Sequence, residues 1–206
     1  MPNGLFKVIT YIDGFNLYNG LCDKGWRRYL WLDLLEFSKN LLQFNQELVR
    51  VKYFTADMTH NPSKYERQSI YLDALKTLEF VEIIKGTFLL VPFECPLCNK
   101  TYHKHKEKMT DVNIAIEMLL DAKKNHFDTA ILVSGDSDLV PIVKYLVQKL
   151  GKRVVIALPP ERWSDHLKDV AGRYYPIGRD KFAKSQLPEI ISRPDLSPLI
   201  RPSSWV

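Results

Sequence analysis

Short apolar segments of strand length alternate with amphipathic segments of helix length, and this alternation constrains the fold more than any other feature. Residues 7–12 (KVITYI) and 129–133 (TAILV) are rich in β-branched and apolar side chains, as buried strands are. Residues 111–124 form the strongest helical pattern, with apolar side chains around much of the circumference. This alternation predicts an α/β fold in which helices cover both faces of a central, mostly parallel sheet.

The rest of the chain continues the pattern up to about residue 182. Further strands are expected at residues 48–55, 81–85, 87–91, 153–158 and 174–177, and further helices at residues 30–42, 62–78, 139–150 and 161–170. Residues 183–206 are rich in proline, which predicts an extended tail with few contacts. We therefore expect one domain at residues 1–182 and a tail at 183–206. The two alternatives for the tail are that it docks a partner protein or that it is simply mobile.

Two of the predicted strands end in turns that carry aspartate. Asp13 directly follows residues 7–12, and the turn at residues 134–138 (SGDSD) directly follows residues 129–133. Ligand sites in parallel sheets lie beyond the carboxyl ends of the strands. If the two strands are neighbours, four carboxylates converge at one rim, with one of them at the start of the helix at 111–124. These four are Asp13, Asp111, Asp136 and Asp138.

So many like charges are unfavourable together unless a cation neutralises them, and carboxylate oxygens favour Mg²⁺ or Mn²⁺. Such a site suits phosphodiester hydrolysis, in which a divalent metal activates water and stabilises charge on the phosphate. Asn16 is expected to position water or phosphate. Ser134 is expected either to touch substrate phosphate or metal or to stabilise its turn. The alternative is that these aspartates only cap helices and shape turns.

Three segments resemble, in order, the motifs of NYN domains, the bacterial (LabA-like) branch of the PIN-like ribonucleases. They are residues 11–16 (YIDGFN), 107–113 (EKMTDVN) and 134–139 (SGDSDL), and the resemblance extends from about residue 5 to 180. It implies a PIN-like, three-layer Rossmannoid fold and a Mg²⁺ or Mn²⁺ site at the four aspartates, with RNA as the substrate. Lys108 occupies the motif position before the helix, where it either contacts a phosphate or is an ordinary solvated lysine.

An insert at residues 92–108 shows no strand or helix period and contains four potential zinc ligands. Cys95 and Cys98 form a CxxC pair, the usual half of a structural zinc site, and His103 and His105 follow. The His-x-His spacing is tighter than the usual spacing of about three to five residues between histidines, which disfavours binding of both to one ion. The alternatives are a CxxC loop without metal, a redox pair, or a zinc shared with another chain.

The charge of the chain favours an anionic partner. The net charge is +5 and the pI is about 9.0, which suits a phosphate polymer such as RNA. The basic run at residues 103–108 and the pair Arg27 and Arg28 are candidate strand-binding patches, although a charge run is more often a solvated face. Neither a secretory signal nor an apolar run of the roughly 20 residues that span a bilayer is visible, which predicts a cytoplasmic protein without membrane contact.

The leading hypothesis is a metal-dependent ribonuclease that hydrolyses RNA with water activated by a divalent metal. A second hypothesis is an RNA-binding or regulatory module of the same fold with little turnover. A third is a DNA or nucleotide phosphohydrolase, since one fold hosts many chemistries. The oligomeric state is not determined by these patterns, and a homo-oligomer is compatible with each hypothesis.

Overall fold

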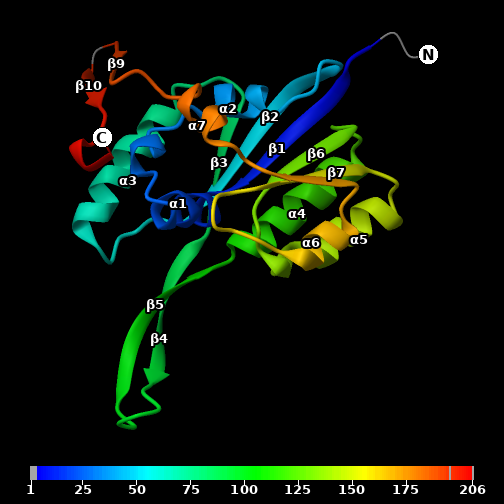
Figure 1. Cartoon of the computed structure of the whole chain (residues 1–206). Helices are drawn as coiled ribbons and strands as arrows, with labels where there is room; N and C mark the ends of the chain where they lie inside the picture. The colour runs from blue at the N-terminus through cyan, green and yellow to red at the C-terminus, as the bar shows by residue number, and fades with distance from the viewer. Residues whose placement is uncertain (1–3, 195, 206) are drawn as a thin grey trace.

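The computed structural model describes residues 4–194 and 196–205, which form a six-stranded parallel sheet with helices on both faces (Figure 1). All five strand pairs in the sheet are parallel. In the order β3-β2-β1-β6-β7-β8, the strands are Val81–Lys85, Gln46–Thr55, Phe6–Asp13, Thr129–Val133, Arg153–Leu158 and Arg173–Pro176.

Helices α1 (Gly14–Asp23), α2 (Leu34–Asn40), α3 (Pro62–Leu75) and α7 (Arg179–Ala183) cover one face of the sheet, and α4 (Thr110–Lys123), α5 (Val140–Gln148) and α6 (Asp165–Val170) cover the other (Figure 1). Alternate side chains of each buried strand enter different cores. In β1, Val8 and Ile12 pack with the first group of helices, whereas Ile9 and Tyr11 pack with the second. The predicted three-layer α/β fold is confirmed.

The direction in which the chain builds the sheet reverses between β1 and β6. After β1 the chain adds β2 and β3 on one side, and α4 then carries it across to β6, from which β7 and β8 extend the other side. This is a topological switch point, and in open α/β sheets ligands bind beyond the strand ends at such points. Asp13 ends β1, and Ser134 directly follows β6.

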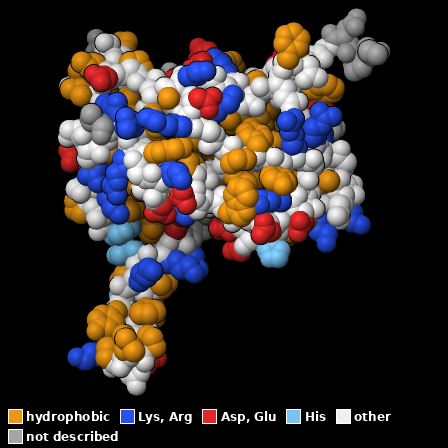
Figure 2. All heavy atoms as spheres, in the orientation of Figure 1, with side chains coloured by type: hydrophobic (Ala, Val, Ile, Leu, Met, Phe, Trp, Pro, Cys, Tyr) orange, Lys and Arg blue, Asp and Glu red, His pale blue; other side chains and the backbone are white. Residues whose placement is uncertain are grey.

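Strands β4 (Thr87–Glu94) and β5 (Thr101–Lys108) form an antiparallel hairpin that projects from the domain (Figure 1). The insert at 92–108 therefore contains strand structure that its sequence pattern did not predict. The reason is that both faces of β5 are largely exposed, so backbone pairing, and not burial, determines its structure. The hairpin carries exposed apolar side chains (Figure 2), namely Leu89, Leu90, Phe93, Leu97 and Tyr102.

Gly86 separates β3 from β4 at a point where the chain comes very close to the start of α4. A Cβ atom at this position would lie 2.6 Å from the Lys108 carbonyl oxygen and 2.8 Å from Thr110 Oγ1. Only glycine fits without displacing the backbone. The close approach joins the hairpin base to the helix that carries Asp111.

The C-terminal segment folds onto the domain. Strands β9 (Ile190–Arg193) and β10 (Leu196–Ile200) pair antiparallel, and Trp205, only 6% exposed, packs with Trp31 and Tyr71. The prediction of an extended tail with few contacts is wrong for the described part, because apolar side chains between the prolines join the core. A partner protein on this segment stays a prediction. In the described part of the chain, helices are too short or too polar to cross a membrane.

Candidate metal centre

Asp13 occupies the junction between β1 and α1 and is 4% exposed. As the N-cap of α1, its Oδ1 accepts a hydrogen bond from the backbone N–H of Asn16 at 3.0 Å. The next residue is glycine because a Cβ at Gly14 would lie 2.5 Å from the Phe54 carbonyl oxygen on β2. The local sequence therefore holds this carboxylate in a fixed position at the strand end.

The turn after β6 is tied to Asp13 by hydrogen bonds. Ser134 Oγ donates to Asp13 Oδ2 at 2.9 Å and accepts from the Asp136 backbone N–H at 3.0 Å. Asn16 Oδ1 accepts from the Gly135 backbone N–H at 3.0 Å. In the structure, Ser134 and Asn16 thus position the turn that carries Asp136 against the end of β1.

Asp111 lies in the first turn of α4, which starts directly after the hairpin. The carboxylate oxygens of Asp13, Asp111 and Asp136 lie within 4.8 Å of one another, and within residues 4–194 and 196–205 they are the only such group of possible metal ligands. Asp138 is exposed and lies beside this group, with its backbone N–H donating to Asp136 Oδ1 at 2.9 Å. The structure therefore assembles three of the four predicted carboxylates and places the fourth at the edge.

Burial and the charges of neighbouring carboxylates make Asp13 and Asp111 costly to ionise without a cation. Burial is the main cause that raises the pKa of Asp13 from 3.8 to about 6, against the opposing hydrogen bonds from Asn16 and Ser134, and the charges of Asp111 and Asp136 raise it further. Burial and then the charges of Asp136 and Asp138 also raise the pKa of Asp111. A cluster of hard oxygen donors with uncompensated negative charge fits a divalent cation such as Mg²⁺ or Mn²⁺.

Glu107, near the end of β5, is a fifth carboxylate that the sequence did not single out. Burial, opposed by the hydrogen bond from Thr110, and the charges of Asp13, Asp111 and Asp136 raise the pKa of Glu107 from 4.5 to about 7. Glu107 stands four residues before Asp111, inside the motif at 107–113, so the motif included the residue. Its orientation toward the acidic centre depends on the hairpin, which the sequence did not reveal.

The predicted basic residues lie outside the acidic centre. Arg27 and Arg28 are exposed on the short helix η1 (Arg27–Tyr29), beyond the far end of α1, so about 15 Å of helix separates them from Asp13. Lys108 is exposed at the last position of β5, paired with Thr87. Their contact with a substrate stays a prediction.

The four predicted zinc ligands occupy two parts of the hairpin. Cys95 and Cys98 lie at the turn, where hydrogen bonds from the backbone N–H groups of Leu97 and Cys98 lower the pKa of the Cys95 thiol. His103 and His105 lie on β5, and His105 stacks on His60 with ring centroids 4.2 Å apart. In the described chain, no three of these four bring their ligand atoms within 4.8 Å of one another. The zinc site stays a prediction.

A parallel sheet with clustered carboxylates beyond two strand ends at its switch point defines an α/β protein with an acidic centre, as in PIN-like nucleases. The sequence profile of the NYN domain matches residues 7–178, and the chain belongs to this family, whose members are typically nuclease-like.

One relative is the protein named 6-hydroxy-3-succinoylpyridine 3-monooxygenase HspA of Pseudomonas putida (strain DSM 28022 / S16). It is 28% identical, and the match covers 97% of this chain and 75% of the relative. Among solved structures, the chain resembles the crystal structure of a protein of unknown function, VPA0982, from Vibrio parahaemolyticus RIMD 2210633. The TM-score is 0.58 at 21% identity, over 87% of this chain and 98% of that chain. The second likeness supports the fold alone.

Proposed function

We propose that this protein is a metal-dependent ribonuclease that hydrolyses phosphodiester bonds of RNA. The observation that carries the proposal is the meeting of Asp13, Asp111 and Asp136, from three separate elements, within 4.8 Å at the switch point of the sheet. Membership of the NYN domain family supports nuclease chemistry. The positive net charge of the chain favours a polyanionic substrate.

Asp13, Asp111 and Asp136 would hold Mg²⁺ or Mn²⁺, with Asp138 beside them. When bound, the cation supplies activation of water and neutralises charge on the phosphate. Ser134 and Asn16 act through their hydrogen bonds, which keep Asp13 and the Asp136 turn in register. Because these bonds connect β1, α1 and the β6 turn directly, the carboxylates are arranged before any ligand arrives.

A cleavage assay on labelled RNA tests the proposal. We expect cutting with Mg²⁺ or Mn²⁺, no cutting in EDTA, and background activity for Asp13→Asn and Asp136→Asn. Asp169→Asn, which removes the same charge from an exposed position on α6, should cut like the parent. Equal cutting by all three variants would mean that a contaminant or another site is responsible.

Assays on the same purified protein also distinguish two related alternatives from the ribonuclease. An RNA-binding module without turnover would bind RNA in EDTA as tightly as with Mg²⁺ and would cut nothing. A DNA or nucleotide phosphohydrolase would prefer those substrates in a panel of RNA, single-stranded DNA, duplex DNA and nucleotides. Preference for RNA in the panel, with metal-dependent cutting, supports the ribonuclease.

A second candidate function comes from the relative named as a monooxygenase, whose match covers nearly all of this chain. It would be hydroxylation of a small aromatic ring, and an aromatic-lined cavity beside the acidic centre gives such a ring a place to bind. Oxygen uptake that depends on 6-hydroxy-3-succinoylpyridine and a reduced nicotinamide or flavin donor would support it. We expect no such oxygen uptake from this protein. Uptake that occurs and survives Asp13→Asn would favour the monooxygenase over the ribonuclease.

A further inference from the structure

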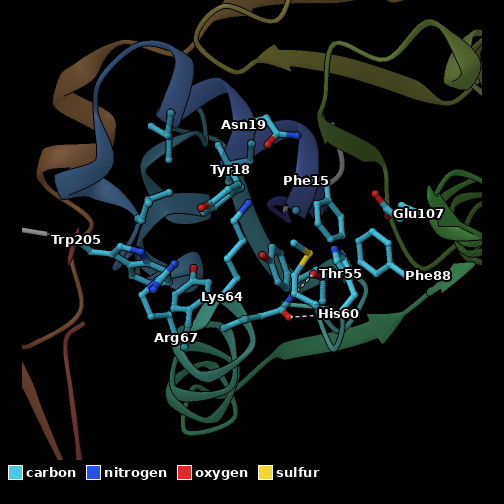
Figure 3. A pocket seen from close by; sticks show the side chains of 18 of the residues that line it. Phe15, Tyr18, Asn19, Thr55, His60, Lys64, Arg67, Phe88, Glu107 and Trp205 are labelled. Atoms are coloured by element: carbon cyan, nitrogen blue, oxygen red, sulfur yellow. Dashed lines mark hydrogen bonds between the residues drawn. The ribbon is translucent and has the colours of Figure 1, made fainter. Parts of the chain in front are cut away.

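A cavity of about 490 Å³ lies next to the acidic centre, between α1, α3 and the base of the β4–β5 hairpin (Figure 3). Its volume falls in the range of pockets that bind small ligands or parts of larger ones. The lining includes Phe15, which lies two residues after Asp13. It also includes Glu107, whose pKa is raised in part by the charge of Asp13. In Figure 3, Glu107 lies at one end of the cavity and Trp205 at the other. The cavity therefore lies beside the acidic centre and extends away from it.

The cavity wall carries an excess of positive charge. Lys64 and Arg67 of α3 and Lys104 of β5 line it, against Glu107 as the one carboxylate. Across the described ranges, none of these three cations is in an ion pair with a carboxylate. Figure 3 shows Lys64 and Arg67 between Trp205 and His60, away from the Glu107 end. Unneutralised cations beside a partly apolar cavity favour an anionic ligand.

The same cavity offers aromatic faces. Phe15 and Phe88 meet edge to face, with ring centroids 5.5 Å apart, near Glu107. Tyr18 lies farther along α1, and Trp205 closes the opposite end (Figure 3). Phe15, Tyr18 and Phe88 are partly exposed, so their rings are accessible from the cavity. Aromatic faces of this kind stack on flat ring systems, nucleic-acid bases above all.

The ligand that these walls suit is a flat aromatic ring joined to an anionic group. We propose that the cavity binds one nucleotide of the RNA strand next to the bond that is cut, with its base against Tyr18 and its phosphate at Lys64 and Arg67. The proposal rests on the ribonuclease function, because a strand with a phosphate at the acidic centre passes Phe15 and enters the cavity. Lys, Arg and His side chains gather where the hairpin leaves the domain (Figure 2), which suits the continuing backbone.

Binding of small probes to the full chain in EDTA tests the nucleotide site without any cutting. The probes are AMP, adenosine, which lacks the phosphate, and ribose 5-phosphate, which lacks the base. Calorimetry should show that AMP binds more tightly than either fragment by about tenfold or more. Equal affinity for AMP and ribose 5-phosphate would overturn the base site, and equal affinity for AMP and adenosine would overturn the phosphate site.

Variants locate the binding. Arg67→Ala and Tyr18→Leu should each weaken the binding of AMP by about tenfold. Lys149→Ala, which removes an exposed cation directly after α5, should leave the AMP affinity unchanged. Unchanged affinity in Arg67→Ala would overturn the proposal. A third binding experiment uses 6-hydroxy-3-succinoylpyridine, which, like AMP, joins a flat aromatic ring to an anionic group. If it binds tenfold more tightly than AMP and depends on Arg67, the cavity takes small aromatic acids and the nucleotide assignment is wrong.

The two proposals fail in different ways. If the parent cuts RNA and Arg67→Ala leaves the KM for RNA unchanged, the nucleotide site is refuted and the ribonuclease stands. If AMP binds as expected but the parent cuts no RNA, the ribonuclease is refuted, and the cavity is a nucleotide site that does not lie beside a bond that is cut. A raised KM with little change in kcat for Arg67→Ala, together with weaker AMP binding, supports both.

Discussion

Replacement of Asp13 by asparagine should make the metal-free protein more stable at neutral and alkaline pH, although it removes a metal ligand. Asp13 is 4% exposed, and burial is the main cause that raises its pKa from 3.8 to about 6. Asparagine keeps the shape and can still accept the hydrogen bond from the Asn16 backbone N–H. It carries no charge, so the cost of a buried carboxylate disappears.

The sign and size follow from the two pKa values. Between pH 4 and 6 the folded protein keeps a proton on Asp13 that the unfolded chain has released, so the free energy of unfolding falls as the pH rises. The shift of about 2 units, at about 1.36 kcal/mol each, predicts a loss of about 3 kcal/mol that is complete above pH 7. Asp13→Asn should escape this loss. In a chain of 206 residues, about 3 kcal/mol corresponds to about 6–12 °C in Tm.

Chemical and thermal denaturation in EDTA, at several values between pH 4 and 8, measures the effect. The stability of Asp13→Asn relative to the parent should rise through this range and level off. The exposed control Asp169→Asn should show no such trend. Excess Mg²⁺ should stabilise the parent and not Asp13→Asn, because only the parent keeps the complete ligand set. A difference that is independent of pH, or a less stable Asp13→Asn at pH 8 in EDTA, would refute the reasoning.

Three further predictions concern the rest of the molecule. Lys52→Met should destabilise the protein by about 3–5 kcal/mol, because it removes the buried cation of Asp121, whose remaining partners are the Tyr11 hydroxyl and the exposed His126 ring; a cost below about 1 kcal/mol in urea denaturation would contradict this. Trp205→Ala should cost about 3–5 kcal/mol through the cavity it leaves, and an unchanged Tm would mean that the C-terminal segment is not packed as described. Elemental analysis of protein purified without chelator should find zinc in the parent and none in the Cys95→Ser, Cys98→Ser double variant; a parent without zinc would remove the zinc site.

The relation between strands and acidic residues was readable from the sequence because it is local. A buried strand needs a continuous apolar run, and Asp13 and the turn at 134–138 directly follow such runs. The alternation of strands and helices determined the layers, since each buried strand must be covered on both faces. The family resemblance and the match of the NYN domain to residues 7–178 agree with this local reading.

Only the tertiary structure decided which side chains meet. Asp138 is separated from Asp136 by one residue, yet the turn leaves it at the edge, while Asp111 reaches the centre from a different element. Glu107 faces the centre because an exposed hairpin, held by backbone pairing, ends beside α4. Trp205 closes the cavity from a segment whose prolines suggested few contacts. These placements depend on contacts between residues far apart in the chain, which no local pattern of side chains records.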